Sequence, residues 1–140
     1  MKRCICAIAI FVVVIFLTSI ETRAIAEKAE PTLIPMHATA YLDTGRKTYS
    51  GVWPHVGIAG SHKDYIGMTA IVYQRLPNGE VGEVIGIYEV EDTGDTEGVN
   101  NKRVIDIWCP DMDSCQDLMD RVYEDGCQGK VFVQFVNAEG

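Results

Sequence analysis

Six short segments rich in β-branched and aromatic residues follow one another along the chain after residue 36. Gly, Asn and Pro separate them, and such runs divided by turn residues are typical of strands. The Pro-Asn-Gly sequence at residues 77–79 suits a hairpin turn, because Asn and Gly tolerate positive φ. The pattern predicts strands at residues 37–42, 55–59, 68–76, 84–90, 104–108 and 131–136.

One segment between the last two predicted strands has helical spacing. Leu118, Met119 and Val122 form a single apolar face. Ser114 is the N-cap that we expect, and Gly126 ends the helix. Six strands and one short helix in a chain of this length predict an all-β fold, a small six-stranded barrel, because closure removes exposed sheet edges.

The start of the chain has the three parts of a secretory signal peptide. A cationic beginning, Lys2 and Arg3, is followed by an apolar run of fourteen residues and then by an Ala-Ile-Ala sequence. The alternative is a membrane anchor, but the run is too short for a helix to span a bilayer about 30 Å thick. We expect cleavage of the signal peptide 1–26 after Ala26, a flexible lead-in over 27–35 and a barrel domain over 36–140.

The net negative charge of the chain limits the kinds of partner that it can bind. The chain has 12 basic and 20 acidic residues, a net charge of −8. Cleavage after Ala26 leaves nine basic and nineteen acidic residues, a net charge of −10. Such a polyanion lacks the cationic face that nucleic acid requires, and anionic lipid does not attract it. We therefore expect a secreted or cell-envelope protein that binds no nucleic acid and keeps no stable membrane anchor.

Three cysteines remain after cleavage, Cys109, Cys115 and Cys127. They allow at most one internal disulfide and leave one thiol over. Their spacings do not fit a zinc site, and we expect neither a metal nor a cofactor. Because acidic residues surround the thiols in the sequence, we expect their pKa values to be raised and their reactivity to be low.

Carboxylates are the remaining candidates for chemistry, because the chain has no Gly-x-Ser-x-Gly elbow and no phosphate-binding glycine loop. Asp92 lies where a predicted strand ends in a Thr-Gly turn, and Asp106 lies inside the predicted strand 104–108. Strand alternation places Val104, Asp106 and Trp108 on one face. Apolar surroundings would raise the pKa of Asp106, as a general acid needs; the alternative is a solvated aspartate on an outer face.

Four segments resemble the three-aspartate (3D) domain family, which includes membrane-bound lytic transglycosylase A and the stationary-phase survival proteins. They are Ala-Thr-Ala-Tyr at 38–41, Val-Glu-Asp-Thr-Gly at 90–94, Val-Ile-Asp-Ile-Trp at 104–108 and Gly-Lys-Val-Phe-Val at 129–133. The resemblance covers residues 39–136. It implies a six-stranded double-psi β-barrel and, without a cofactor, cleavage of peptidoglycan glycan strands without water, which leaves a 1,6-anhydromuramyl end.

The resemblance also assigns the catalytic residues. Asp106 matches the family's catalytic acid, and Asp92 matches the aspartate beside it. The family's first aspartate falls on Ser61. Asp92 and Asp106 lie fourteen residues apart, farther than is usual, so that residues 94–101 contain an insertion.

Candidate substrate-binding residues lie in the first half of the domain. The Thr-Ala-Tyr-Leu-Asp sequence that begins at Thr39 is similar to the opening of family 45 glycoside hydrolases, in which that aspartate is the base. The alternative is a strand that ends in an Asp-Thr-Gly turn. We expect substrate contacts from Thr39, Tyr41, Asp43 and Trp53. Tyr41, Trp53 and Trp108 are candidates to stack on sugar rings, although large aromatic residues more often belong to the core.

Three functions remain open. The first is an exported, monomeric lytic transglycosylase that acts on peptidoglycan glycan strands. The second is a non-catalytic barrel that binds the cell wall or a glycan. The third is a calcium site formed by oxygens from residues 92–101 and 111–113, which do not follow the EF-hand order.

Overall fold

The computed structural model describes residues 31–94 and 97–138. The chain divides into two compact units, Met1–Pro31 and Thr32–Gly140, and the second contains all of the described helices and strands. The predicted signal peptide and residues 27–30 of the predicted lead-in lie outside the described residues. Ile34 and Pro35, the last two residues of the predicted lead-in, already belong to the first strand. Within the described part of the chain, no helix has the length and apolar character that membrane crossing requires.

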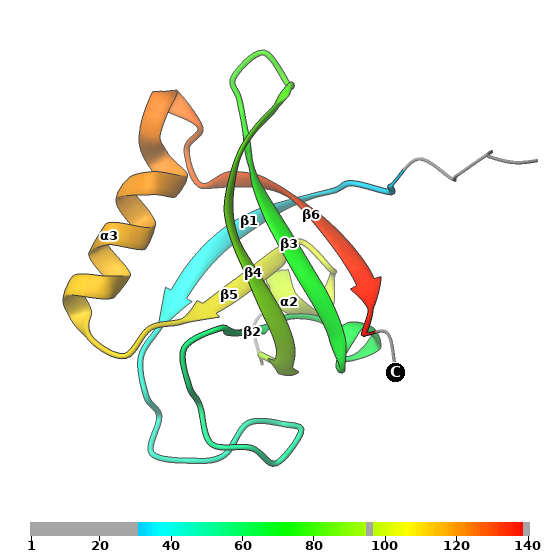
Figure 1. Cartoon of the computed structure of the whole chain (residues 1–140), viewed down its shortest axis with the longest axis vertical. Helices are drawn as coiled ribbons and strands as arrows, with labels where there is room; N and C mark the ends of the chain where they lie inside the picture. The colour runs from blue at the N-terminus through cyan, green and yellow to red at the C-terminus, as the bar shows by residue number, and fades with distance from the viewer. Residues whose placement is uncertain (1–30, 95–96, 139–140) are drawn as a thin grey trace, which may run out of the picture. The chain divides into compact units, whose positions relative to one another are not determined.

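Six strands form a closed barrel in the order β1-β5-β2-β4-β3-β6 (Figure 1). The β1–β5 and β2–β4 pairs are parallel, and the other four pairs are antiparallel. Each strand therefore has two neighbours, which confirms the predicted all-β barrel. The strands are β1 (Ile34–Tyr41), β2 (Ile58–Gly60), β3 (Met68–Arg75), β4 (Val81–Asp92), β5 (Val104–Trp108) and β6 (Lys130–Asn137).

The strand positions follow the predicted ones, but only β5 has the predicted bounds, and β1 starts at Ile34, three residues earlier than predicted. β2 has only three residues, because residues 42–57 form a long loop where a strand was expected from residue 55. β4 has twelve residues and continues to Asp92, because it pairs with β3 along most of its length and with β2 at its end. The predicted turn at residues 77–79 is confirmed, with Gly79 at φ +86°.

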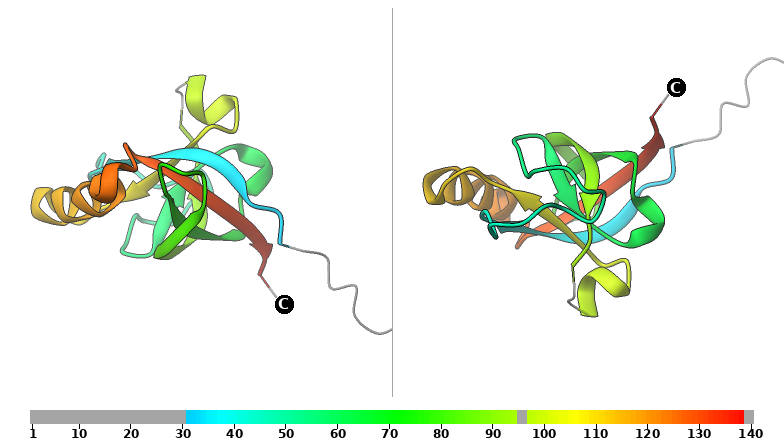
Figure 2. Two further views of the ribbon diagram at one scale, coloured as in Figure 1. Left: turned by 90° about the horizontal axis from the view of Figure 1, so that it is seen from above. Right: turned by 90° about the horizontal axis from the view of Figure 1, so that it is seen from below.

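Among the described residues, two helices and two single 3₁₀ turns accompany the barrel, and Figure 2 shows α2 and α3 on different sides of it. α3 (Met112–Tyr123) is the predicted helix, and α2 (Glu97–Asn100) lies in the expected insertion. The 3₁₀ turns are η1 (Lys63–Tyr65) and η2 (Glu124–Gly126).

The predicted N-cap of α3 is wrong. Asp111, not Ser114, caps the helix, and its Oδ1 atom accepts a hydrogen bond of 2.7 Å from the Ser114 backbone N–H. Asp111 has extended backbone angles, as an N-cap residue requires, whereas Ser114 lies within the first turn. Both residue types cap helices well, so the choice between them depends on where the backbone leaves the helical conformation.

Alternation along the strands separates the core from the outer surface. In β5, Ile105 and Ile107 are buried in the core, and Val104, Asp106 and Trp108 share the opposite, half-buried face, as predicted. The apolar face of α3 covers part of the barrel. It includes Cys115 in addition to the predicted residues Leu118, Met119 and Val122. Its buried residues are Cys115, Leu118 and Val122.

Candidate active site

Gly60 brings the two candidate aspartates together. It ends β2, which lies between β4 and β5, and its register partners are Asp92 in β4 and Asp106 in β5. Adjacent strands are about 4.8 Å apart, so the two aspartate backbones lie roughly 10 Å from each other across the glycine. Two residues that are fourteen positions apart in sequence thus meet at one end of the short central strand.

A cleft of about 450 Å³ opens over this end of β2. Asp92, Asp106 and Gly60 line it from the barrel, and Tyr41 lines it from the end of β1. Residues 44 and 46–49 of the long loop form the remaining wall. The cleft therefore contains both candidate carboxylates and has the concave shape that a ligand site requires.

Asp106 is half-buried and faces its register partner across the parallel β1–β5 pair. The Thr39 hydroxyl donates a hydrogen bond of 2.7 Å to Oδ1 of Asp106. Burial raises the pKa of Asp106, the Thr39 hydrogen bond lowers it, and the nearby charge of Asp92 raises it. Desolvation dominates, so the pKa is raised, in the direction that a general acid needs.

Asp92 differs from Asp106 because it accepts three hydrogen bonds. Its Oδ1 atom accepts from the Tyr49 backbone N–H at 3.0 Å and from the Thr93 backbone N–H at 2.9 Å. Its Oδ2 atom accepts from the Tyr41 hydroxyl at 3.3 Å. Burial, followed by the charges of both aspartates, raises the pKa of Tyr41, which therefore stays a donor. All three contacts use Asp92 as a hydrogen-bond acceptor.

Ser61, at the expected position of a first aspartate, is fully buried and does not line the cleft. Its hydroxyl donates to the Val104 carbonyl at 3.2 Å, and its backbone N–H donates to the Asp92 carbonyl at 3.0 Å. Ser61 thus links β2 to both neighbouring strands and supports the two aspartates without contributing a third carboxylate.

The four predicted substrate-binding residues separate into two pairs. Thr39 and Tyr41 belong to the site, because each donates a hydrogen bond to one of its aspartates. Asp43 and Trp53 do not line the cleft. Asp43 accepts a hydrogen bond of 2.8 Å from the Gly45 backbone N–H, and Trp53 is 60% exposed on the same loop.

Sequence reasoning missed the loop wall. Arg46, Lys47, Thr48 and Tyr49 line the cleft, although the sequence offered no pattern that ties them to Asp92 or Asp106. Their one sequence signal is a pair of adjacent cations followed by polar and aromatic residues in a segment without strand alternation.

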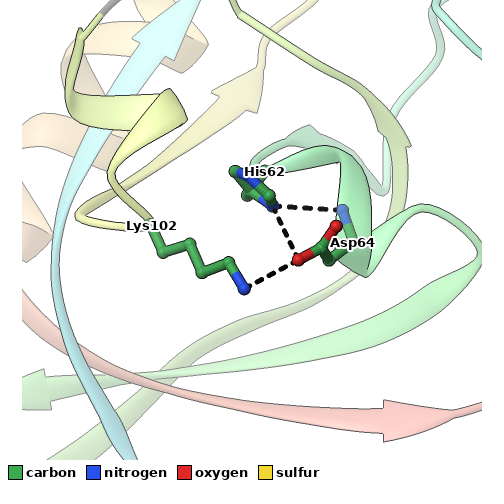
Figure 3. Close-up of polar contacts among 3 residues, drawn as sticks. All are labelled: His62, Asp64 and Lys102. Atoms are coloured by element: carbon green, nitrogen blue, oxygen red, sulfur yellow. Dashed lines mark hydrogen bonds and ion pairs between the residues drawn. The ribbon is translucent and has the colours of Figure 1, made fainter.

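A second polar cluster lies outside the cleft (Figure 3). Lys102 Nζ lies 2.7 Å from Oδ2 of Asp64, and His62 Nδ1 lies 3.3 Å from the same oxygen. The Asp64 backbone N–H also donates to His62 Nδ1 at 3.2 Å. The Lys102 hydrogen bond lowers the pKa of Asp64. These contacts join the segment after α2 to η1 and have no part in the site.

The calcium alternative gains no support from the arrangement of ligands. Asp111 caps α3, and the Asp92 oxygens accept three protein hydrogen bonds. Among residues 31–94 and 97–138, no group of three or more His, Cys, Asp or Glu side chains is placed to hold a metal ion.

The three cysteines are free thiols, and all are buried. Burial raises the pKa of Cys109 to about 12, with a smaller contribution from the hydrogen bond to Cys115. Burial also raises the pKa of Cys127, and the acidic residues nearby add to the effect. The predicted direction is confirmed for these two thiols, but burial is a larger cause than the acidic neighbours.

The chain matches no protein-family model, and comparison with curated proteins finds no significant match. The function therefore has to be inferred from the site itself.

Proposed function

We propose that the protein is an exported lytic transglycosylase that cleaves peptidoglycan glycan strands, with Asp106 as general acid and base. One observation carries this proposal. Asp106 is a half-buried carboxyl with a raised pKa, and it lines a cleft that it shares with Asp92. A carboxyl with a raised pKa next to one that accepts three hydrogen bonds is the pairing from which acid and base roles are assigned.

Each step of the reaction can use the same carboxyl. Protonated Asp106 donates its proton to the glycosidic oxygen, and the bond from that oxygen to C1 of the muramyl residue breaks. The muramyl C6 hydroxyl then attacks C1 and returns its proton to Asp106. Because the sugar supplies its own nucleophile, no second carboxylate is needed to activate water. The negative charge of Asp92 adds to the effect of burial on the pKa of Asp106 and stabilises the positive charge that develops on the sugar.

We also propose that the barrel is of the double-psi class and that the chain is a member of the three-aspartate family. Two parallel pairs in an otherwise antiparallel six-stranded barrel support the first point. The meeting of the two matched aspartates at Gly60 supports the second. Residues 1–26 would then direct a monomeric protein to the cell envelope or the medium.

The alternative is a barrel that binds the cell wall and does not cleave it. Ser61 favours this alternative, because a buried serine replaces the family's first aspartate. Such a protein would keep the cleft and lose turnover.

The deciding experiment incubates the purified protein with peptidoglycan and measures anhydromuropeptides by mass spectrometry. Asp106→Asn removes the titrating group, and Asp113→Asn is the matched control, because Asp113 is exposed and lies outside the cleft. General acid–base catalysis contributes about 10²–10⁴ in rate, so Asp106→Asn should lower product formation at least about a hundredfold. Wall binding without products would establish the non-catalytic alternative, and products that persist in Asp106→Asn would exclude the proposed role of Asp106.

A further inference from the structure

Two adjacent cations, Arg46 and Lys47, line the cleft from the loop wall. Both are exposed. Within the described part of the chain, neither side chain takes part in an ion pair or a hydrogen bond, and the ion pairs found there involve His62, Asp64 and Lys102. Unpaired cations at a cleft are notable in a chain with a net charge of −8.

The loop that carries these cations is fixed to the barrel at the residues that follow them. Thr48 is buried, and its backbone N–H and hydroxyl both donate to the Val52 carbonyl, at 2.9 and 3.1 Å. The Tyr49 backbone N–H donates to Asp92, and the Ser50 backbone N–H donates to the Glu91 carbonyl at 3.0 Å. The backbone next to Lys47 is therefore held against the end of β4, which places the two cations at a fixed edge of the cleft.

The charges across the cleft are arranged in two groups. The aspartates lie on the barrel side, and the cations lie on the loop side, without an ion pair between the two groups. Asp92 would repel a wholly anionic ligand, and Arg46 and Lys47 would repel a cationic one. A neutral sugar ring over the aspartates with a carboxylate on one side satisfies both groups, since guanidinium and ammonium groups both bind carboxylates well.

We propose that Arg46 and Lys47 bind a carboxylate carried as a side substituent of the sugar that lies over Asp92 and Asp106. The site is then selective for acidic glycans over neutral ones. This inference rests on the proposed function, in which the sugar is a muramyl residue. The carboxylate is either the free lactyl carboxylate of a muramyl residue without a peptide or a carboxylate of the peptide that is amide-linked to the lactyl group.

The test measures binding by calorimetry with three probes. Peptidoglycan strands carry peptides, strands stripped by an amidase keep only the lactyl carboxylate, and chitin oligosaccharides have neither. Each probe is titrated into the protein and into an Asp106→Asn form, in which turnover is suppressed. The variant is Arg46→Gln with Lys47→Gln, and the control is Lys130→Gln, an exposed cation outside the cleft.

We expect the double variant to bind acidic strands about three- to tenfold more weakly than the unsubstituted protein, the scale of exposed ion pairs. Its affinity for chitin oligosaccharides and its melting temperature should stay unchanged. Added salt should weaken the binding of acidic strands to the unsubstituted protein more than to the double variant, because salt screens exposed charges. A loss confined to peptide-bearing strands identifies a peptide carboxylate. A loss confined to stripped strands identifies the lactyl carboxylate, which is free only where the peptide has been removed, and a loss with both acidic probes shows that the two cations accept either carboxylate.

Equal affinity of the unsubstituted protein for all three probes would overturn the inference, as would binding to none of them. A loss of the same size in Lys130→Gln would also overturn it, because a general charge effect would then suffice. The proposed function fails in a different way. If no anhydro product forms while the charge-dependent preference persists, the cations recognise acidic glycans in a binding protein.

Discussion

The Thr39 hydroxyl makes Asp106 give up its proton more readily than burial alone would allow. The threonine hydroxyl donates to the aspartate at 2.7 Å, and this bond opposes the effect of burial by stabilising the charged form. Thr39→Val removes the hydroxyl and keeps the shape of the side chain, so we expect the pKa of Asp106 to rise further. The carboxyl ¹³C chemical shift of Asp106, followed by NMR as a function of pH, measures this change independently of activity.

Thr39→Ser is the matched control for this prediction, because it retains the donor and should keep the Asp106 titration close to that of the unsubstituted protein. If the protein cleaves glycan, the high-pH limit of its activity should move upward in Thr39→Val and stay in place in Thr39→Ser. An Asp106 titration that stays unchanged in Thr39→Val would show that the Thr39 hydrogen bond has no influence on the protonation of this group.

Cys109 should be inert toward thiol reagents in the folded protein. Its pKa of about 12, against an ordinary value of 9.0, lowers the thiolate fraction near pH 8 about a thousandfold. Burial also blocks access, since Cys109 is only 3% exposed. Alkylation by iodoacetamide at pH 8, followed by peptide mass spectrometry with and without urea, should label Cys109 only in the unfolded chain. Rapid labelling of the folded protein would contradict the buried position of this thiol.

For single residues, the sequence predicted which side chains share a face of a strand but not which groups form hydrogen bonds with them. Alternation within β5 correctly placed Asp106 on a face with Val104 and Trp108, because a strand fixes side-chain direction every two residues. The bond from the Tyr49 backbone N–H to Asp92 joins residues 43 positions apart. No local pattern encodes such a contact, because it depends on how the loop 42–57 folds back.

At the scale of the element, the start of α3 depends on one side chain. Asp111 accepts from the Ser114 backbone N–H, and this bond lowers its pKa. We expect Asp111→Ala to lower the melting temperature by a few degrees, because it leaves helix N–H groups unpaired. Asp111→Asn is the matched control, since asparagine caps about as well as aspartate. Thermal unfolding followed by circular dichroism measures both variants.

The capping contribution should also depend on pH. The folded-state pKa of Asp111 lies below its ordinary value of 3.8, so the stability due to its charge is present above that value and is lost as the pH falls through the lowered pKa. An Asp111→Ala protein as stable as the unsubstituted one at pH 7 would assign the cap to another residue, and Ser114 would be the first candidate.

The elements also show where sequence patterns stop being informative. β5 has the predicted bounds, residues 104–108, because an alternating apolar run defines a strand clearly. β2 has three residues instead of the predicted five and starts at Ile58. The predicted segment included His55 and Val56, whose β propensity is realised only where a neighbouring strand is available for pairing.

For the whole molecule, the count of strands predicted a barrel, but the order of the strands could not be predicted. The parallel β1–β5 pair joins two segments between which β2, β3 and β4 lie in the sequence. The periodicity of apolar residues carries no information about such pairing. That order nevertheless creates the site, because it places β2 between β4 and β5. Gly60 thereby lies between Asp92 and Asp106.

Stability of the whole domain should reveal the cost of ionising Asp106. Its folded-state pKa lies above the ordinary value of 3.8, so the native state binds this proton more tightly than the unfolded chain does. Below pH 3.8 the carboxyl is protonated in both states and does not lower the free energy of unfolding. As the pH rises through the raised folded-state pKa, the native state must hold a buried charge, and stability falls. The free energy of unfolding of the unsubstituted protein is therefore lowered by this buried charge at neutral pH.

Asp106→Asn removes the charge and keeps an oxygen that can accept from Thr39. We expect this variant to melt at a higher temperature than the unsubstituted protein at pH 7, and the difference to shrink toward zero as the pH falls to about 3.8. Taking the difference between the two proteins at each pH removes the titration of all other carboxyls, and Asp113→Asn, in an exposed residue, should show no such trend. A variant that is less stable at pH 7 would mean that the charged carboxylate is stabilised in its cleft, and Asp106 would then lack the raised pKa on which its role as an acid depends.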